Sequence, residues 1–246
     1  MARPNATLQR LYVEADLAAD TLLPLAEKQS HYLRNVMRLQ AGDSVLLFNG
    51  RHGEWRARLH KVDKKAVTVE IAERTRAQEP RGDIWLLVAP VKKHRSDYLA
   101  QKATEMGAAR LLPVITRRTQ QKSAVKRDKL LANAIEAAEQ CNLLSLPQID
   151  EAQNLSALLA DWPSDRKLLF CDEEAAAGTG AGELAGLKGE KLAVLIGPEG
   201  GFDDDERAAL AALPHVVSLS LGPRILRTDT AVVAALTLMQ AHAGDW

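Results

Sequence analysis

The sequence predicts a mixed α/β protein, in which a small β-rich domain precedes an α/β domain with a mostly parallel sheet. Two observations support this. In the first 71 residues, short strand-like segments flank turns that contain glycine or charged residues. From residue 83 onward, five apolar segments alternate with helical patterns, which is typical of a sheet covered on both faces. A chain of 246 residues with 46% hydrophobic and 26% charged residues suffices for one or two domains.

In the first domain the pattern predicts four strands and one short helix. The strands are expected at residues 8–13, 44–48, 54–62 and 66–71. Apolar residues at helical spacing predict a helix over residues 27–39. Strands around one short helix suggest a small barrel. The proline, glycine and charges of residues 72–82 indicate a linker.

In the second domain buried strands and helices alternate. Strands are expected at residues 83–91, 110–116, 166–171, 191–197 and 216–221. Helices are expected at residues 96–107, 126–141, 203–213 and 229–242, with Ser96 as the cap of the first. The sequence holds no internal repeat that would indicate a solenoid.

The net charge of zero conceals an uneven distribution. Residues 80–130 contain 12 Lys and Arg against 4 Asp and Glu, whereas residues 131–246 contain 7 against 18. A basic segment of this density is typical of proteins that bind a polyanion such as nucleic acid, provided that its side chains share one face. Solvated surface charge is the alternative.

Several classes of protein are disfavoured by the composition. The longest apolar run, at residues 231–239, is too short to cross a membrane, and the first residues do not resemble a signal peptide. Cys141 and Cys171 lie far apart without the spacing of a zinc site, and we expect both to be small buried residues. These features lead us to expect a soluble cytoplasmic protein without a metal.

A glycine-rich loop follows the strand predicted at residues 191–197. It reads IGPEGGF (196–202), and glycine at the end of a parallel strand lets a ligand approach the backbone. It lacks the phosphate-binding glycine motifs. Acidic residues at 199 and 203–206 oppose an anion at the following helix, although Asp203 and Glu206 have the spacing of a capping box. A neutral or cationic ligand suits this loop, and a merely structural turn is the alternative.

A second loop, LSLGPRILRTDT (219–230), again joins a strand to a helix through a Gly-Pro turn. Two arginines flank two apolar residues, which are able to line a pocket for a flat heterocycle. Thr228 or Asp229 is able to cap the next helix. The alternative is that Ile225 and Leu226 pack in the core while the arginines are solvated.

Taken together, GPEGG (197–201) and LSLGPRILRTDTA (219–231) resemble the signature of the ribosomal RNA uracil-N3 methyltransferases (the RsmE type), which belong to the SPOUT class of knotted methyltransferases. The resemblance spans nearly the whole chain. HYLRNVMRLQAGDSVLLFNG (31–50) resembles the family's PUA-like barrel, and residues 91–119 resemble its basic segment. The chain departs from the family at Asp229, where glutamate is usual, and at Asn142-Leu143, where Gly-Arg is usual.

The resemblance implies a PUA-like RNA-binding barrel over residues 1–74 and a SPOUT domain with a trefoil knot over residues 80–246. It implies S-adenosyl-L-methionine as cofactor and a homodimer. Carried over residue by residue, the cofactor site consists of Phe170, Cys171, Ile196, Gly197, Glu199, Gly201, Leu219, Leu221, Gly222, Ile225 and Leu226.

The activity that this resemblance implies is methylation of N3 of a uridine in small-subunit (16S) rRNA. The transfer needs an unpaired base, an acceptor for the N3 proton and stabilisation of the charge that develops on the uracil oxygens. We assign that stabilisation to Arg227, with Arg224 second. Asp229 is a candidate for orienting Arg227 or accepting the proton, although capping the helix is its favoured role.

We assign the contact with rRNA or the small ribosomal subunit to Arg10, Arg34, Arg38, Lys92, Lys93, Arg95, Arg117 and Arg118. Arg10 and Arg34 match arginines usual in the family, and the others are chosen on charge density. Two alternatives remain open at this point. One is another SPOUT enzyme that methylates a ribose 2′-OH or tRNA, and the other is a non-catalytic RNA-binding assembly factor.

Overall fold

The computed structural model describes residues 8–64, 66–91, 93–120, 126–175 and 184–246 of the chain. Its contacts divide the chain into two compact units. The first reaches Pro80 and also includes Ala138–Leu146, whereas the second comprises Arg81–Ala137 and Pro147–Trp246. The predicted mixed α/β class is confirmed, but the assignment of residues 138–146 to the first unit is not foreseen by the sequence.

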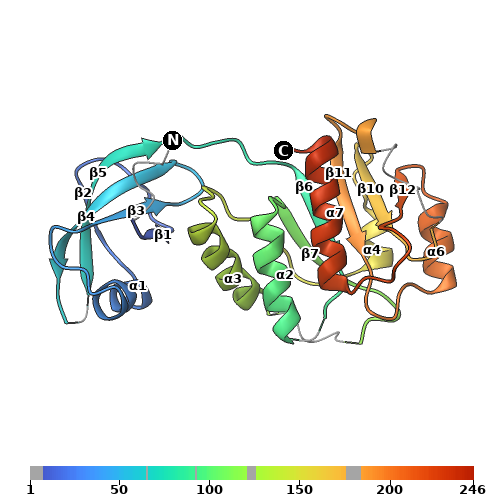
Figure 1. Ribbon diagram of the computed structural model, residues 1–246, viewed down its shortest axis with the longest axis horizontal. Coiled ribbons are helices and arrows are strands. Elements are labelled where there is room, and N and C mark those ends of the chain that lie inside the picture. Colours follow the sequence, from blue (N-terminus) through green and yellow to red (C-terminus); the bar gives the residue numbers. More distant parts are fainter. Residues whose placement is uncertain (1–7, 65, 92, 121–125, 176–183) are drawn as a thin grey trace. The chain divides into compact units, whose positions relative to one another are not determined.

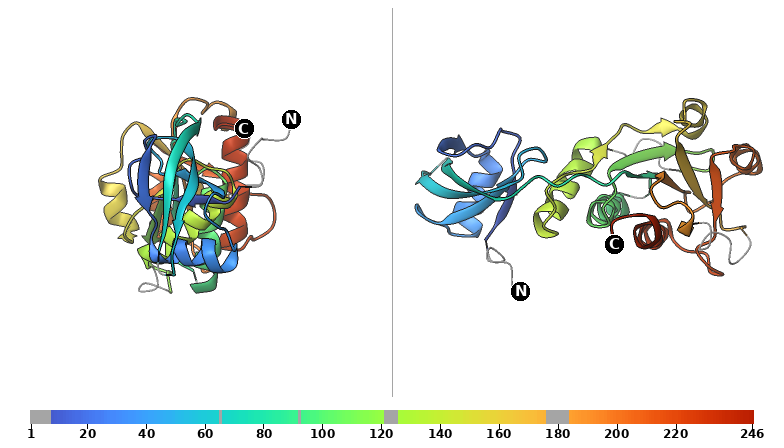
Figure 2. Two further views of the ribbon diagram at one scale, coloured as in Figure 1. Left: turned by 90° about the vertical axis from the view of Figure 1, so that its left-hand side faces the viewer. Right: turned by 90° about the horizontal axis from the view of Figure 1, so that it is seen from above.

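The first unit is built on a sheet in the order β1-β3-β4-β5-β2. Its strands are β1 (Arg10–Tyr12), β2 (Thr21–Pro24), β3 (Ser44–Phe48), β4 (Glu54–Val62) and β5 (Val67–Arg76). Neighbours are antiparallel except for the parallel pair β1–β3. The strands curl around one another (Figure 2). The core that they enclose includes Leu33, Val45 and Ile71.

Three local predictions for this unit need correction. The edge strand β2 was not predicted, because most of its residues are exposed and it ends in a proline. The expected linker is partly strand, since β5 continues to Arg76 on the edge that pairs with β4. The expected helix consists of α1 (Glu27–His31) followed by the π-helical turn η1 (Tyr32–Val36), and it ends before Arg38, whose φ is 57°.

Arg10 lies in the interior of the first unit rather than on an RNA-binding face. Its side chain is 8% exposed, and its Nε donates to Glu54 at 2.9 Å. The guanidinium also donates to the carbonyl oxygens of Ala138, Glu139 and Leu143. The prediction of an RNA contact for Arg10 is therefore wrong: its charge is balanced by a buried carboxylate and its donors are directed at the backbone.

The same segment explains the departure at Asn142-Leu143. Asn142 has a φ of 63°, a left-handed conformation that asparagine tolerates better than most residues. Its backbone and side-chain oxygens both accept hydrogen bonds from Arg76 at 3.0 Å. An asparagine here thus keeps the backbone conformation that a glycine would allow and adds an acceptor.

The second unit is built on a parallel sheet in the order β12-β10-β11-β6-β7-β8, with β9 also paired to β7. Its strands are β6 (Ile84–Val88), β7 (Arg110–Ile115), β8 (Gln148–Ile149), β9 (Gln153–Asn154), β10 (Arg166–Cys171), β11 (Lys191–Ile196) and β12 (Val216–Leu219). Each of the pairings described is parallel, which confirms the predicted sheet type. The two-residue strands β8 and β9 are too short to leave a periodic pattern.

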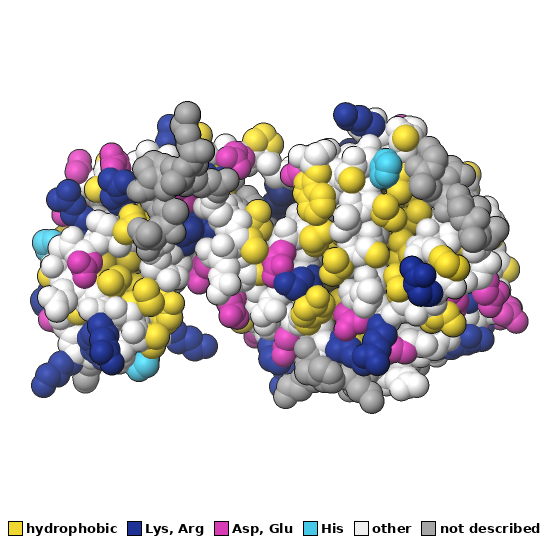
Figure 3. All heavy atoms as spheres, in the orientation of Figure 1, with side chains coloured by type: hydrophobic (Ala, Val, Ile, Leu, Met, Phe, Trp, Pro, Cys, Tyr) yellow, Lys and Arg dark blue, Asp and Glu magenta, His cyan; other side chains and the backbone are white. Residues whose placement is uncertain are grey.

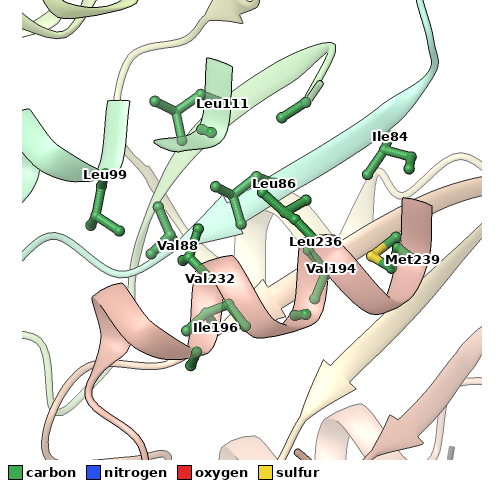
Figure 4. Packing of buried hydrophobic residues seen from close by; sticks show 14 of the residues in the cluster. Ile84, Leu86, Val88, Leu99, Leu111, Val194, Ile196, Val232, Leu236 and Met239 are labelled. Carbon is green, nitrogen blue, oxygen red and sulfur yellow. The ribbon is translucent and has the colours of Figure 1, made fainter. Parts of the chain in front are cut away.

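Helices cover both faces of this sheet, as predicted. They are α2 (Lys93–Glu105), α3 (Arg127–Gln140), α4 (Leu155–Ala160), α6 (Asp204–Ala211) and α7 (Thr228–Ala243). On one face, α7 lies beside α2 (Figure 1), and its Val232, Leu236 and Met239 pack against the sheet (Figure 4). On the other face, Trp162, Phe202 and Leu210 form a second apolar cluster.

The helix starts differ from the predictions by a few residues. Helix α2 begins at Lys93, so Ser96 lies inside it and its hydroxyl donates to the carbonyl oxygen of Val91 at 2.9 Å. Helix α6 begins as predicted, because Asp203 and Glu206 form a capping box. Within the residues described, no helix is long and apolar enough to cross a membrane and no group of His, Cys, Asp and Glu could hold a metal ion.

Candidate cofactor site

The candidate site lies where three neighbouring parallel strands end. Cys171, the last residue of β10, is in register with Ile196, the last of β11, and with Leu219, the last of β12. Carboxyl ends of parallel strands meet at one edge of a sheet, which is where α/β proteins bind ligands. The register therefore brings together the loops that follow these strands.

A cleft of about 230 Å³ opens between these loops. It is lined by Cys171, Asp172, Glu173, Ile196, Gly197, Pro198, Glu199, Gly200, Gly201, Leu219, Leu221, Gly222, Arg224, Ile225, Leu226, Thr228 and Ala231. The two loops singled out in the sequence thus meet in space. All residues predicted to contact the cofactor line this cleft except Phe170.

Phe170 faces the opposite side of the sheet. Successive side chains of a strand point to opposite faces, so Phe170 and Cys171 cannot both face the cleft. The ring of Phe170 instead packs edge-on against that of Phe202, with centroids 4.9 Å apart. The assignment of Phe170 to the cofactor site is therefore wrong. Its side chain packs against Phe202, at the end of the first loop.

Thr228 joins the two loops directly. It is buried, and its hydroxyl donates to the carbonyl oxygen of Gly197 at 3.1 Å. The sequence pointed to Thr228 only as a candidate helix cap. In the structure α7 begins at Thr228, Arg227 is the N-cap residue and no side-chain cap is formed. Its hydroxyl is thereby available to fix the second loop against the first.

Replacement of Thr228 by valine tests this connection. Valine has nearly the same shape, so the change removes the hydrogen bond and leaves the Gly197 carbonyl without that donor. We expect the free energy of unfolding to fall by about 1 kcal/mol and the Kd of the cofactor to rise about fivefold, as measured by denaturation and calorimetry. Thr230→Val, at an exposed position two residues on, is the matched control. Equal effects of both variants would contradict this role.

The glycines of the first loop allow it to pack closely on its neighbours. A Cβ at Gly197 would lie 2.6 Å from the ring of Phe202. Gly201 has a φ of 66°, and a Cβ there would collide with the carboxylate of Glu173. The sequence attributes these glycines to the approach of a ligand. In the structure they are also needed by the protein itself, because no side chain fits at either position.

The acidic residues at the start of α6 are directed away from the cleft. Arg117 makes ion pairs with Asp203 at 2.9 Å and Asp205 at 2.6 Å, and its backbone N–H donates to Glu206. The hydrogen bonds that Arg117 donates to Asp205 and Asp203 raise the pKa of Arg117 above its ordinary value. Acidic side chains gather over α6 at the right-hand edge in Figure 3. The negative wall of the cleft comes instead from Asp172, Glu173 and Glu199, of which the sequence predicted only Glu199.

Two other arginines that the sequence assigns to RNA contact the first loop (196–202). Arg95 makes an ion pair with Glu199 at 3.1 Å, and Arg118 donates to the carbonyl oxygen of Gly200 at 3.1 Å. The side chain of Arg95 is 23% exposed, whereas Arg118 is open to solvent. The basic segment therefore borders the cleft. Its Lys92 lies outside the described residues, and Lys93 is the first residue of α2.

The remaining RNA candidates are in the first unit. Arg34 is half-buried and donates to the carbonyl oxygens of Asp63 and Lys64. Arg38 is exposed just after the π-helical turn. The exposed apolar side chains of Val36 and Met37 precede it. Within this unit Arg38 is thus more accessible to RNA than Arg34.

The three residues predicted to be catalytic lie at the second loop. Arg224 lines the cleft and is exposed, whereas Arg227 is exposed at the N-cap of α7, next to buried Thr228. Asp229 lies in the first turn of α7, where a carboxylate interacts favourably with the helix dipole. The prediction that Asp229 caps the helix is wrong, because the helix begins one residue before it.

Cys171 is suited to packing rather than to nucleophilic chemistry. Burial raises the pKa of its thiol far above the ordinary value, so the thiol is protonated at neutral pH. Cys141, in contrast, is exposed, and the expectation that it is buried is wrong. Cys141 follows the last turn of α3, where the chain turns through Asn142.

Comparison with known proteins identifies the family. Residues 77–240 match the RNA methyltransferase domain and residues 25–72 the RNA methyltransferase PUA domain. Ribosomal RNA small subunit methyltransferase E of Rickettsia conorii is 31% identical over 96% of this chain and 98% of its own length. The Bacillus subtilis protein of the same name is 27% identical over 94% and 95%.

Two solved structures that contain S-adenosylmethionine are similar along nearly the whole chain. One is a methyltransferase of Legionella pneumophila, with a TM-score of 0.86, 30% identity and coverage of 97% of this chain and 99% of that one. The other is ribosomal RNA small subunit methyltransferase E of Neisseria gonorrhoeae, with a TM-score of 0.85, 28% identity and the same coverage. The chain therefore belongs to the family of RNA methyltransferases that includes ribosomal RNA small subunit methyltransferase E.

Proposed function

We propose that this protein transfers the methyl group of S-adenosylmethionine to N3 of a uridine in 16S rRNA. The observation that carries the proposal is the cleft in which the GPEGG loop and the GPRILRT loop meet. Relatives with these domains are named for methylation of small-subunit rRNA, and two similar structures contain the cofactor. An enzyme with this substrate acts where ribosomal subunits are assembled, in the cytoplasm.

The residues of the cleft fit this cofactor chemically. Leu219, Leu221 and Leu226 offer apolar surface for an adenine ring, and backbone groups of the two loops are available to its edge. Carboxylates of Asp172, Glu173 and Glu199 suit the positive charges of a sulfonium and an ammonium group better than they suit a phosphate. When bound, the cofactor supplies a methyl group activated by the positively charged sulfur.

The protein's own task in the transfer is to position the base and to stabilise charge. The N3 atom of uracil loses a proton, and negative charge develops on O2 and O4. The guanidinium groups of Arg227 and Arg224, at the second loop, are the positive charges that we assign to stabilising it. Asp229 lies two residues after Arg227, in the first turn of α7. It is the candidate for orienting Arg227 or accepting the proton. In-line transfer depends on positioning, so a covalent nucleophile is not required.

We further propose that the protein acts as a homodimer and binds RNA through its basic residues. Ile225 is 89% exposed at the rim of the cleft, and hydrophobic side chains reach the surface over α7 (Figure 3). A partner subunit would cover this apolar surface. Arg38 and Arg118 are exposed and available to RNA phosphates. We also propose that the second unit forms the trefoil knot expected of the SPOUT class.

The proposed activity is tested with the purified protein, isotopically labelled S-adenosylmethionine and small ribosomal subunits or 16S rRNA that lack the modification. Nucleoside mass spectrometry of the digested RNA should reveal 3-methyluridine. Labelled 2′-O-methylnucleosides would assign the enzyme to ribose chemistry instead. Cofactor binding without methyl transfer to either substrate would favour a non-catalytic RNA-binding role.

A further inference from the structure

A largely buried arginine, Arg207, lies behind the acidic wall of the cleft and pairs with several carboxylates. Arg207 of α6 makes ion pairs with Asp172 and Glu173, the latter at 2.8 Å, and a longer one with Glu174 at 3.4 Å. The side chains of Arg207 and Asp172 are only 13% and 14% exposed. Asp172 and Glu173 line the cleft, whereas Arg207 does not. Arg207 therefore contacts two of the cleft's carboxylates from the side away from the ligand space.

The position of Arg207 is fixed by its own helix. The capping box of Asp203 and Glu206 defines the start of α6, and Arg207 follows in the first turn. Its Nε also contacts the carbonyl oxygen of Phe202 at 3.4 Å, at the end of the first loop. One guanidinium thus connects the glycine loop after β11 to the acidic segment after β10.

The electrostatics of the cluster require this cation. Asp172 and Glu173 are adjacent carboxylates that repel each other without a cation between them, and Asp172 is only 14% exposed. Burial disfavours the charged form of Arg207, but the carboxylates of Asp172 and Glu173 outweigh it and raise the pKa of Arg207 above its ordinary value. The guanidinium is therefore charged at all working pH values and offers several donors in one plane.

The packing of Gly201 shows how closely this segment lies on the loop. A Cβ on Gly201 would collide with the Glu173 carboxylate and would lie 3.6 Å from the Arg207 guanidinium. The carboxylate that contacts Arg207 is thus seated directly on the backbone of the first loop.

We propose that Arg207 is a positioning residue for the cofactor: it holds Asp172 and Glu173 in place as one wall of the cleft and thereby raises the affinity for S-adenosylmethionine. The inference rests on the proposed function, since it concerns the same cleft. Arg207 acts by keeping the side chains of Asp172 and Glu173 ordered, because Arg207 itself does not face the ligand space. Loss of Arg207 therefore weakens binding of the charged cofactor and of its uncharged-sulfur product, S-adenosylhomocysteine.

The experiment compares the Kd of both compounds, measured by isothermal titration calorimetry, for the wild type, Arg207→Met and Arg207→Lys. We expect Arg207→Met to raise both Kd values about tenfold, because the segment must be ordered at the moment of binding. Arg207→Lys keeps the charge without the planar fork and should recover part of the affinity. Lys191→Met is the matched control, since it also removes a cation paired with a carboxylate, at the opposite end of the sheet.

Three results would overturn the proposal. Unchanged Kd values in Arg207→Met would show that the wall does not need Arg207. Tighter binding of S-adenosylmethionine alone would show that Arg207 merely neutralises the cleft. Equal losses in Arg207→Met and Lys191→Met would point to general destabilisation.

Arg207→Lys alone decides the matter if Arg207→Met does not fold, because it keeps the positive charge and removes the planar donors. The proposal expects weaker binding of both compounds than in the wild type, and unchanged binding would overturn it. A wild-type protein that binds neither compound would instead overturn the proposed function, whatever the variants do.

Discussion

Replacement of Arg227 by alanine should lower kcat by about a hundredfold to a thousandfold, the range observed when one fixed charge-stabilising donor is lost. The Kd of S-adenosylmethionine should change by less than about twofold, because Arg227 does not line the cleft. The fold should tolerate the change, since Arg227 is exposed and its side chain does not cap α7. Single-turnover methylation and calorimetry measure the two quantities separately.

Arg224→Ala is the informative comparison for this variant. Arg224 does line the cleft, so its loss should raise the Kd of the cofactor as well as slow the transfer. Arg227→Lys keeps a positive charge without the planar donors and should retain an intermediate rate. Wild-type turnover in Arg227→Ala would remove Arg227 from the catalytic assignment.

Replacement of Gly197 by alanine should strongly weaken the affinity for the cofactor. The new Cβ would lie 2.6 Å from the ring of Phe202, which is fully buried and packed against Phe170. Because the ring has no room to move, the loop must shift, and the shift disturbs the hydrogen bond from Thr228 to the Gly197 carbonyl. Overpacking of this kind costs about 1–3 kcal/mol.

For Gly197→Ala we therefore expect a Kd at least about tenfold higher and a Tm lower by several degrees. Calorimetry and thermal unfolding of the protein without cofactor measure these effects. Gly82→Ala is the matched control, because a Cβ at Gly82 would meet only the carbonyl oxygen of Gly107, at an ordinary 3.8 Å. Unchanged affinity in Gly197→Ala would mean that the loop adapts, and that its exact conformation does not determine binding.

The sequence predicted strands best where apolar residues form a continuous run or alternate with polar ones. Strands β3, β4 and β10 have the predicted bounds, because residues buried in a sheet leave a pattern that depends only on neighbouring positions. It missed β2, β8 and β9, which are short or exposed and depend on pairing with distant partners. It also missed that residues 138–146 join the first unit, through contacts that only folding creates.

Charged residues were the least predictable part of the site. Arg10 was expected to contact RNA, but it is buried against Glu54. Arg117 was also expected to contact RNA, but it makes ion pairs with acidic residues at the start of α6. A charge in a sequence does not reveal its partner, because an ion pair between residues 10 and 54 has no periodicity to detect. Asp172 and Glu173 were overlooked for the same reason.

By itself, the sequence determined most of the longer strands, that two glycine-bearing loops follow strand ends, and which family the signature resembles. These properties are local, because they depend on side-chain alternation and on residues that turns require. Only the tertiary structure decided that the two loops share one cleft, that Phe170 faces away from it, and that Arg207 supports its acidic wall. Each of these depends on strand order and register, which join residues far apart in the chain through contacts that exist only in the folded state.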